Sequence, residues 1–227
     1  MAKLKPGVQV VKKKGLYYTV GSGNRLRRFK PWLGDRFSFL YDVIMSHSVF
    51  PKKFGGDIQK HYEVLTQALT DAHGKQVLEL ATGSGSAVHF LGSDNHYTGT
   101  DVSPALLKQA VKRFSTAGFS EPEFYVRRAE DLPFENDVFD LCLCILSFNF
   151  FSDVEMVLQE VGRVLIPGGA LVCSVPVPER NRAQSRIRGV LYSEAEWQEM
   201  CQEYGFRFER FPCQNGALLY FRAIKEG

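Results

Sequence analysis

Two carboxylates and two glycines near the middle of the chain have a spacing that suits a nucleotide-type ligand. Glu79 precedes Gly83 and Gly85 by a few positions, and Asp101 ends the next apolar run. Glycines let a backbone approach a ligand closely, and a carboxylate can accept hydrogen bonds from two ribose hydroxyls. This pairing is typical of a cofactor that lies over the carboxyl ends of parallel strands. Val88 stands where a dinucleotide fingerprint requires a third glycine, which argues against a nicotinamide dehydrogenase.

The segments around these residues alternate between apolar runs and helical patterns, as an α/β fold requires. A buried strand is expected over 77–80, followed by the glycine-rich turn and a helix. Ser103 and Pro104 predict the start of a second helix, which stops at Gly118. The continuous apolar run 139–146 predicts a central parallel strand.

The second half of the chain continues the alternation. Ser152 and Glu155 have the spacing of a capping box and predict an amphipathic helix, and Ser193 and Glu196 predict another. The final apolar segments, at 206–211 and 217–223, predict a closing pair of strands.

Two motifs in this framework resemble those of a known family. Residues 79–85 read acidic-x-Ala-x-Gly-x-Gly and residues 163–169 read R-V-L-I-P-G-G. They resemble the class I S-adenosylmethionine (SAM) methyltransferases, in particular the type 11 and related small-molecule group. The resemblance covers 71–223 and implies a Rossmann-like, doubly wound sheet of seven mostly parallel strands, with helices on both faces and the last strand antiparallel. It implies a SAM-dependent methyltransferase.

The resemblance also implies a place for each part of the cofactor. Glu79 and the backbone of 81–85 would hold the amino-acid end of SAM, Asp101 the ribose, and Val102 the adenine face. Main-chain groups near 129–130 would contact the adenine edge. The expected cofactor residues are Glu79, Ala81, Thr82, Gly83, Gly85, Asp101, Val102, Ala129, Glu130, Leu146, Ser147 and Tyr41.

One position departs from the family pattern. Relatives often read D-A-E-x-L-P-F, whereas this chain has Arg128 at the first of these positions. Arginine has no hydrogen-bond acceptor, so the adenine amino group loses this partner or bonds to Glu130 or Asp131 instead. Arg128 could also stack on the purine. The substitution predicts a reduced affinity for SAM.

The segment before the motifs divides into a basic arm, 1–34, and a helical lid, 35–70, ahead of the methyltransferase domain, 71–227. The arm contains nine Lys or Arg and no acid, which leaves 19 basic against 25 acidic residues in the rest, a net charge of −6 against +3 overall. The arm is either a solvated extension or a contact for nucleic acid or another anionic partner, and 8–11 with 16–20 could equally form a hairpin. In the lid, helices are expected around 37–45 and from Asp57.

The acceptor side is less sharply defined. Phenylalanines after the fourth strand of the domain either line an apolar acceptor pocket or fill the core, and the arginine-rich loop 178–189 would suit an anionic substrate or remain solvated. The expected substrate residues are Phe148, Asn149, Phe150, Arg180 and Arg182. If a general base is needed, His47 and His61 are the candidates, with Asn149 as a further polar group near the reacting atoms.

Composition narrows the remaining alternatives. Five cysteines without C-x-x-C spacing predict reduced thiols, no zinc site and a cytoplasmic protein, and no apolar run is long enough to span a membrane. The favoured function is SAM-dependent methylation of a small, aromatic or anionic metabolite. The alternatives are methylation of RNA or protein through the basic arm, and a catalytically inactive binding protein with the same fold.

Overall fold

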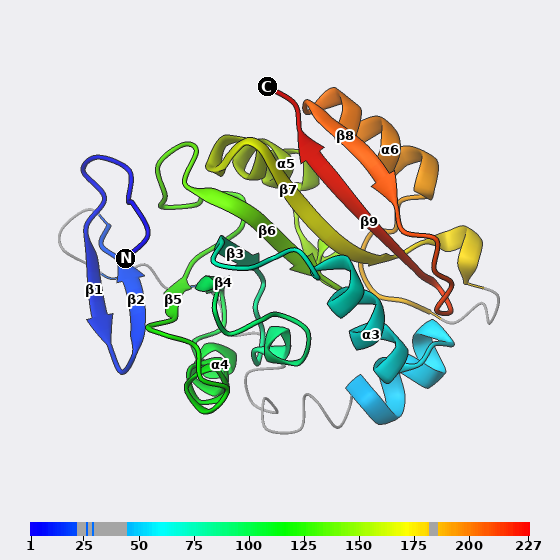
Figure 1. Ribbon diagram of the computed structural model, residues 1–227, viewed down its shortest axis with the longest axis horizontal. Helices are drawn as coiled ribbons and strands as arrows, with labels where there is room; N and C mark the ends of the chain where they lie inside the picture. The colour runs from blue at the N-terminus through cyan, green and yellow to red at the C-terminus, as the bar shows by residue number, and fades with distance from the viewer. Residues whose placement is uncertain (22–25, 27–28, 30–44, 182–185) are drawn as a thin grey trace.

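A mixed β-sheet forms the centre of the protein in the computed structural model, which describes residues 1–21, 26, 29, 45–181 and 186–227. Within these residues the sheet has nine strands in the order β1-β2-β5-β4-β3-β6-β7-β9-β8. Their bounds are β1 Val10–Lys13, β2 Leu16–Thr19, β3 Gln76–Leu80, β4 His96–Asp101, β5 Glu123–Val126, β6 Phe139–Ile145, β7 Leu165–Pro176, β8 Phe206–Arg210 and β9 Leu218–Lys225. The hairpin β1–β2 lies at one edge and β8 with β9 at the other (Figure 1).

The predicted doubly wound sheet is confirmed and is extended at one edge. Strands β5, β4, β3, β6 and β7 are parallel, and β9 is antiparallel to both β7 and β8. The prediction of seven strands was two short, because β2 pairs with β5 in parallel and β1 pairs with β2. Residues 10–19 therefore form the hairpin that the sequence had left as one of two alternatives.

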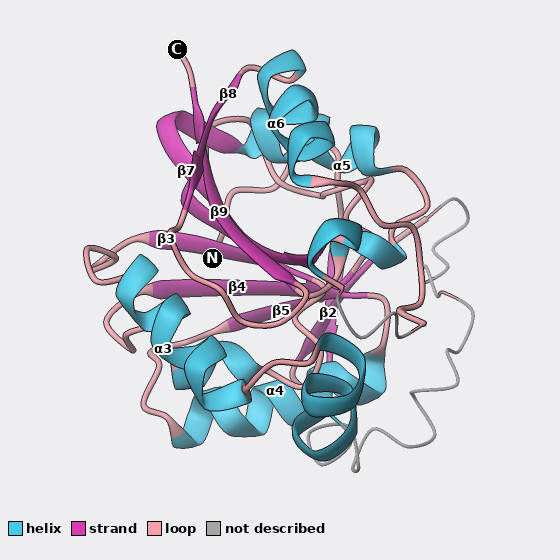
Figure 2. Ribbon diagram, turned by 90° about the vertical axis from the view of Figure 1, so that its right-hand side faces the viewer, coloured by secondary structure: helices cyan, strands magenta, loops and turns pink. Residues whose placement is uncertain are grey.

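Helices cover both faces of the sheet (Figure 2). Helices α3 and α4 lie on one face, over a core that includes Leu65, Leu107 and Phe114, and α5 and α6 lie on the other, over a core that includes Leu158 and Trp197. The helix bounds are α3 Ile58–Ala68, α4 Pro104–Thr116, α5 Val154–Val164 and α6 Glu194–Glu203, with shorter helical segments η3 Met45–Phe54, η4 Ser86–His89, η5 Phe148–Phe150 and η6 Pro178–Arg180. No helix in the described part of the chain is long and apolar enough to cross a membrane.

Most helices start where the sequence predicts. The helix expected from Asp57 is α3, with Asp57 as its cap, and the predicted caps of two other helices are confirmed, since Ser103 caps α4 and Ser193 forms a reciprocal capping box with Glu196. The prediction for α5 was wrong by one residue, because its cap is Asp153, which accepts from the Met156 amide. Ser152 instead donates its hydroxyl to the carboxylate of Glu130. The expected helix around 37–45 lies mostly outside the described residues.

The helix expected after the glycine-rich turn is only the single turn η4. The chain has ten residues between Gly85 and the first residue of β4, and it folds back at Gly92, whose carbonyl accepts from the Asn95 side chain. Too few residues remain for a longer helix. The short connection brings α3 and α4 close to the turn itself.

A buried arginine attaches the hairpin to the rest of the sheet. Arg127, directly after β5, donates Nη1 to the hydroxyl of Thr19 at 2.7 Å and Nε to the carbonyl of Asp131 at 2.5 Å. Its Nη2 lies 2.5 Å from the carboxylate of Asp131. The guanidinium thus joins β2, β5 and the loop after β5.

We expect Arg127→Ala to lower the free energy of unfolding by about 2–3 kcal/mol, because it removes hydrogen bonds of a charged group and leaves the buried Thr19 hydroxyl without its donor. Arg128→Ala is the matched control, because Arg128 is the exposed neighbour, and it should change stability little. Urea denaturation of the three proteins measures the difference. Equal losses in the two variants would contradict the role given to Arg127.

Candidate active site at the ends of β3 and β6

The turn after β3 is built from residues with left-handed backbone. Ala81, Gly83 and Gly85 have φ of 51°, 58° and 87°. Glycine adopts this region without penalty, but a residue with a Cβ is strained there. Glycine is required at position 85 for two reasons. Its backbone is left-handed, and an added Cβ would lie 2.9 Å from the Cα of Ala110 in α4. Gly83 has open space on its Cβ side, with the carbonyl oxygen of Ala81 at 3.8 Å as the nearest neighbour.

Asp101, the last residue of β4, fixes this turn in place. One carboxylate oxygen accepts from the Gly83 amide at 2.9 Å and the other from the Ser103 amide at 2.8 Å. Ser103 in turn caps α4. A single buried carboxylate therefore sets the turn, the end of β4 and the start of α4 relative to one another.

A buried polar group lies beneath the turn. Tyr97 on β4 donates its hydroxyl to the carboxylate of Glu79, and the hydroxyl of Thr82 lies 3.1 Å from the Tyr97 oxygen. Gly99 makes room for this group, because a Cβ there would lie 2.5 Å from the Thr82 hydroxyl oxygen. Burial raises the pKa of Glu79 to about 8, with a smaller contribution from the negative charge of Asp101. Glu79 is therefore mostly protonated at neutral pH.

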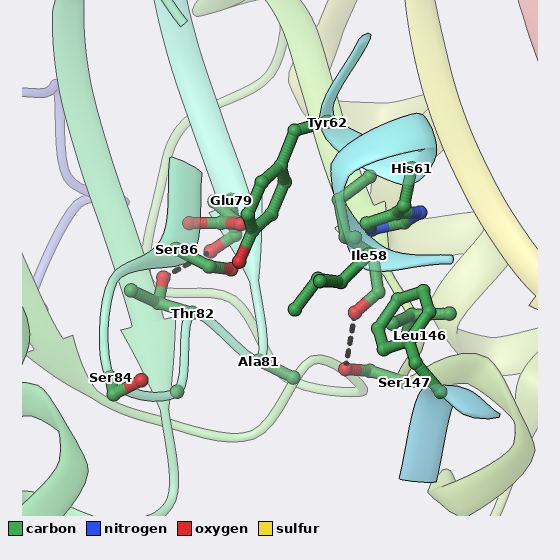
Figure 3. Close-up of a pocket in the computed structure, with 13 residues that line it drawn as sticks. Ile58, His61, Tyr62, Glu79, Ala81, Thr82, Ser84, Ser86, Leu146 and Ser147 are labelled. Carbon is green, nitrogen blue, oxygen red and sulfur yellow. Dashed lines mark hydrogen bonds between the residues drawn. The ribbon is translucent and has the colours of Figure 1, made fainter. Parts of the chain in front are cut away.

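A pocket opens between this turn and α3 (Figure 3). One side carries Glu79 and the turn, the opposite side carries residues of α3, and Leu146 with Ser147 lie after the end of β6. Leu146 is itself left-handed, with φ of 58°. The lining residues are Phe50, Ile58, His61, Tyr62, Glu79, Ala81, Thr82, Gly83, Ser84, Ser86, Ile145, Leu146 and Ser147.

The α3 side of the pocket is apolar apart from two aromatic groups with polar atoms. His61 is buried, and its Nδ1 lies 2.9 Å from the hydroxyl of Tyr220 on β9. Burial lowers the pKa of His61 to about 3, so the imidazole is neutral at physiological pH. Tyr62 stacks on His89, and burial raises the pKa of its hydroxyl.

The structure brings together half of the cofactor residues expected from the sequence. Those that line the pocket are Glu79, Ala81, Thr82, Gly83, Leu146 and Ser147. Asp101 lies behind the turn, and Gly85 faces α4. Val102 is 37% exposed, Ala129 is buried, and the Glu130 carboxylate accepts from Ser152.

The Arg128 guanidinium stands over the ring of Phe29 at 5.7 Å. The guanidinium therefore contacts an aromatic ring of the chain itself. This contact does not test the stacking on purine expected from the sequence. Tyr41 lies outside the described residues.

The expected substrate residues are spread over a wider area. Phe148 is fully buried against Trp197, whereas Phe150 is 60% exposed. Asn149 donates to the carbonyl of Arg188, and its side-chain oxygen is buried with no partner in the described part of the chain. Arg180 lies 2.7 Å from the Glu194 carboxylate.

Of the remaining candidates, Arg182 is outside the described residues. His47 is exposed and does not line the pocket, whereas His61 does. Among the described residues there is no group of three or more His, Cys, Asp or Glu side chains that could hold a metal ion.

Sequence reasoning missed the pocket residues Phe50, Ile58 and Tyr62 as site residues. Ile58 and Tyr62 belong to the helix expected from Asp57, and His61 lies between them in the sequence. The spacing of 58, 61 and 62 puts all three on one side of α3, and this signal could have identified the pocket wall.

We expect Ala81→Gly to raise the free energy of unfolding by about 1 kcal/mol, because it removes the penalty of a left-handed Ala. Ala110→Gly, in the middle of α4, is the matched control and should lower stability by about 1 kcal/mol. Thermal and urea unfolding give both values. A loss of stability in both variants would mean that the turn at Ala81 is not strained.

The raised pKa of Glu79 predicts that stability falls as pH rises through about 8. The folded state holds a proton that the unfolded state, with a pKa near 4.5, has already released. His61 has the opposite sign, and its unfolded-state imidazole is still half protonated at pH 6.5. Because His61 is present in both proteins, its contribution cancels in the difference in unfolding free energy between wild type and Glu79→Gln, and the change of this difference between pH 6.5 and 8 isolates Glu79. A difference that does not change with pH in this window would contradict the assignment.

The comparisons with known proteins agree with this geometry. A family profile described as a methyltransferase domain matches residues 78–173. The chain is 32% identical to the uncharacterized methyltransferase YodH of Bacillus subtilis, over 58% of this chain and 59% of YodH. It is 30% identical to the demethylmenaquinone methyltransferase of Thermotoga maritima, over 75% of this chain and 70% of that enzyme.

A solved structure has the same fold. The crystal structure of an S-adenosylmethionine-dependent methyltransferase from Clostridium acetobutylicum superimposes with a TM-score of 0.66, at 15% identity, over 85% of this chain and 99% of that one. Motifs, strand order and matched length therefore lead to one family, and the chain belongs to the class I SAM-dependent methyltransferases.

Proposed function

We propose that this protein transfers the methyl group of SAM to a small-molecule acceptor in the pocket between the glycine-rich turn and α3. The observation that carries the proposal is the juxtaposition of Glu79 and Gly83 on one side of that pocket with the apolar face of α3 on the other. The demethylmenaquinone methyltransferase of Thermotoga maritima, to which the chain is similar, has a name that indicates a small-molecule acceptor.

The residues present suit the cofactor. The open space on the Cβ side of Gly83 leaves its backbone accessible to a ligand, and any side chain there would fill that space. Glu79 is a buried carboxyl group that lines the pocket, so an ammonium group beside it would favour its charged form. Asp101 stands at the end of β4, beside the turn, where a ribose would contact a carboxylate in a doubly wound fold.

When bound, SAM would supply a methyl group on a positively charged sulfur, from which an electron pair of the acceptor can displace it. The protein's contribution is alignment and exclusion of water. Phe50, Ile58 and Ile145 provide the apolar walls that this requires, and Leu146 and Ser147 lie between the cofactor side and these walls.

We expect SAM to bind wild type in titration calorimetry and Asp101→Asn to bind it at least about tenfold more weakly. The Asn side chain would turn its NH2 group toward the amide of Gly83 or Ser103, which removes a hydrogen bond that holds the turn and one acceptor for the ribose. Asp94→Asn is the control, since Asp94 is an exposed carboxylate that bonds to His73 away from the pocket. NADH should not bind. Unchanged affinity in Asp101→Asn, or no SAM binding by folded protein, would contradict the proposed site.

A macromolecular acceptor is the second candidate. Lys12, Lys13 and Lys14 are exposed together on the hairpin at the edge of the sheet, where an RNA backbone or an acidic protein could contact them. Turnover of SAM with RNA or protein but not with small aromatic acceptors, weakened by salt, would favour it. SAM binding without turnover of any acceptor would favour a binding protein.

A further inference from the structure

A chain of hydrogen bonds leads from the start of α3 through the C-terminal strand to the pocket. Its members are Asp57, Asn215, Tyr220 and His61, and its last ring lines the pocket. Two glycines let the segments meet: a Cβ on Gly56 would lie 2.8 Å from the Asn215 side-chain oxygen, and one on Gly216 would lie 2.0 Å from a backbone oxygen. The close approach keeps the chain of bonds in one arrangement.

The backbone of Asp57 fixes the orientation of the Asn215 amide. The Asp57 N–H can only donate, and it lies 2.8 Å from the Asn215 side-chain oxygen. The Asp57 carbonyl can only accept, and it lies 2.9 Å from the Asn215 nitrogen. The remaining hydrogen of this nitrogen is then donated to the Tyr220 hydroxyl oxygen, 3.0 Å away.

The order of donors and acceptors continues from Asn215 through Tyr220 to His61. The Tyr220 hydroxyl, which accepts from Asn215, lies 2.9 Å from the Nδ1 atom of His61. Its single hydrogen needs an acceptor, and Nδ1 is the one that this arrangement offers, so we assign the O–H as the donor to Nδ1. A neutral imidazole carries its proton on the nitrogen that does not accept, so the proton of His61 lies on Nε2. Burial lowers the pKa of His61 and keeps it neutral, which leaves Nε2 a donor rather than a base.

The pocket wall that contains His61 is mainly apolar. His61 makes no other hydrogen bond within the described residues, its ring lies 5.0 Å from that of Phe50, and Ile58 and Ile145 line the same pocket. An N–H group that loses water without gaining an acceptor costs free energy, so a ligand that enters here must bring an acceptor or lose affinity.

We infer that His61 is a specificity-determining residue that donates Nε2–H to an oxygen of the methyl acceptor, with Tyr220 and Asn215 as its positioning residues. The acceptor is therefore an apolar molecule with a phenolate, enolate or carbonyl oxygen. Its apolar part lies against the wall of Phe50, Ile58 and Ile145 while its oxygen accepts from His61. This inference rests on the proposed function and gives its acceptor a chemical class.

The tautomer is tested first, because it does not depend on SAM or on turnover. In protein labelled with ¹⁵N-histidine near neutral pH, NMR should show His61 with Nε2 protonated and Nδ1 unprotonated, the signal being assigned with His61→Phe. Tyr220→Phe should shift the signal toward a mixture of tautomers, whereas His73→Gln, at an exposed site, should leave it unchanged. A His61 protonated on Nδ1 in wild type overturns the inference.

The acceptor class is tested with two probes of nearly equal shape, 1-naphthol and 1-methylnaphthalene, in the presence of S-adenosylhomocysteine. Wild type should bind 1-naphthol about tenfold more tightly, and the naphthol should shift the His61 Nε2–H resonance. His61→Phe and Tyr220→Phe, with melting temperatures checked, should lose most of this preference. Equal affinity for the two probes, or no binding of either, overturns the inference.

The binding of S-adenosylhomocysteine is measured separately in the same proteins. If the His61→Phe and Tyr220→Phe variants lose the preference for naphthol but still bind S-adenosylhomocysteine, the result supports the role of His61. If wild type does not bind S-adenosylhomocysteine, the proposed function itself is contradicted.

Discussion

The hydrogen bond between the Gly83 amide and the Asp101 carboxylate is the constraint on which the pocket depends. It holds a turn whose residues alternate into left-handed conformation, including Ala81, for which that conformation is unfavourable. The same carboxylate accepts from Ser103, so the turn cannot move without disturbing the start of α4. Strain in the turn is thus balanced by contacts made elsewhere, and the backbone of Gly83 stays open toward the ligand.

Burial rather than charge pairing governs the electrostatics of the pocket. The pKa of Glu79 is raised and that of His61 is lowered, both mainly by burial, so each is neutral near physiological pH. A cationic ligand on the Glu79 side would favour the ionised form of that carboxyl group. On the other side, the neutral His61 adds no fixed charge to the apolar wall, so that wall would not attract water or competing nucleophiles electrostatically.

Local signals in the sequence predicted most of the elements, and contacts between distant segments account for what was missed. The helix start near Asp57 and the caps at Ser103 and Ser193 depend on neighbours within three residues, and the structure confirms them. At α5, Ser152 and Asp153 were both suitable caps, and the choice was decided by Glu130, 22 positions away. The hairpin could not be placed from its own residues, because its partner strand β5 lies more than a hundred positions later.

In the candidate site, too, local signals were predictable from the sequence and contacts between distant segments were not. The glycine spacing and Asp101 identified the turn, but the left-handed Leu146 has no signal in the sequence, because leucine rarely adopts that conformation. The contact between His61 and Tyr220 joins positions 159 residues apart and was not predictable from either.

The pocket is therefore built from two parts of the chain with different roles. The side proposed for the cofactor is a local motif between β3 and β4, whereas the side proposed for the acceptor combines α3 with the C-terminal strand β9. Changes at Tyr220 or Asn215 would alter the second side without touching the turn that Asp101 holds. With this division, the acceptor could change while the cofactor stays the same, and one fold could serve many methyl acceptors.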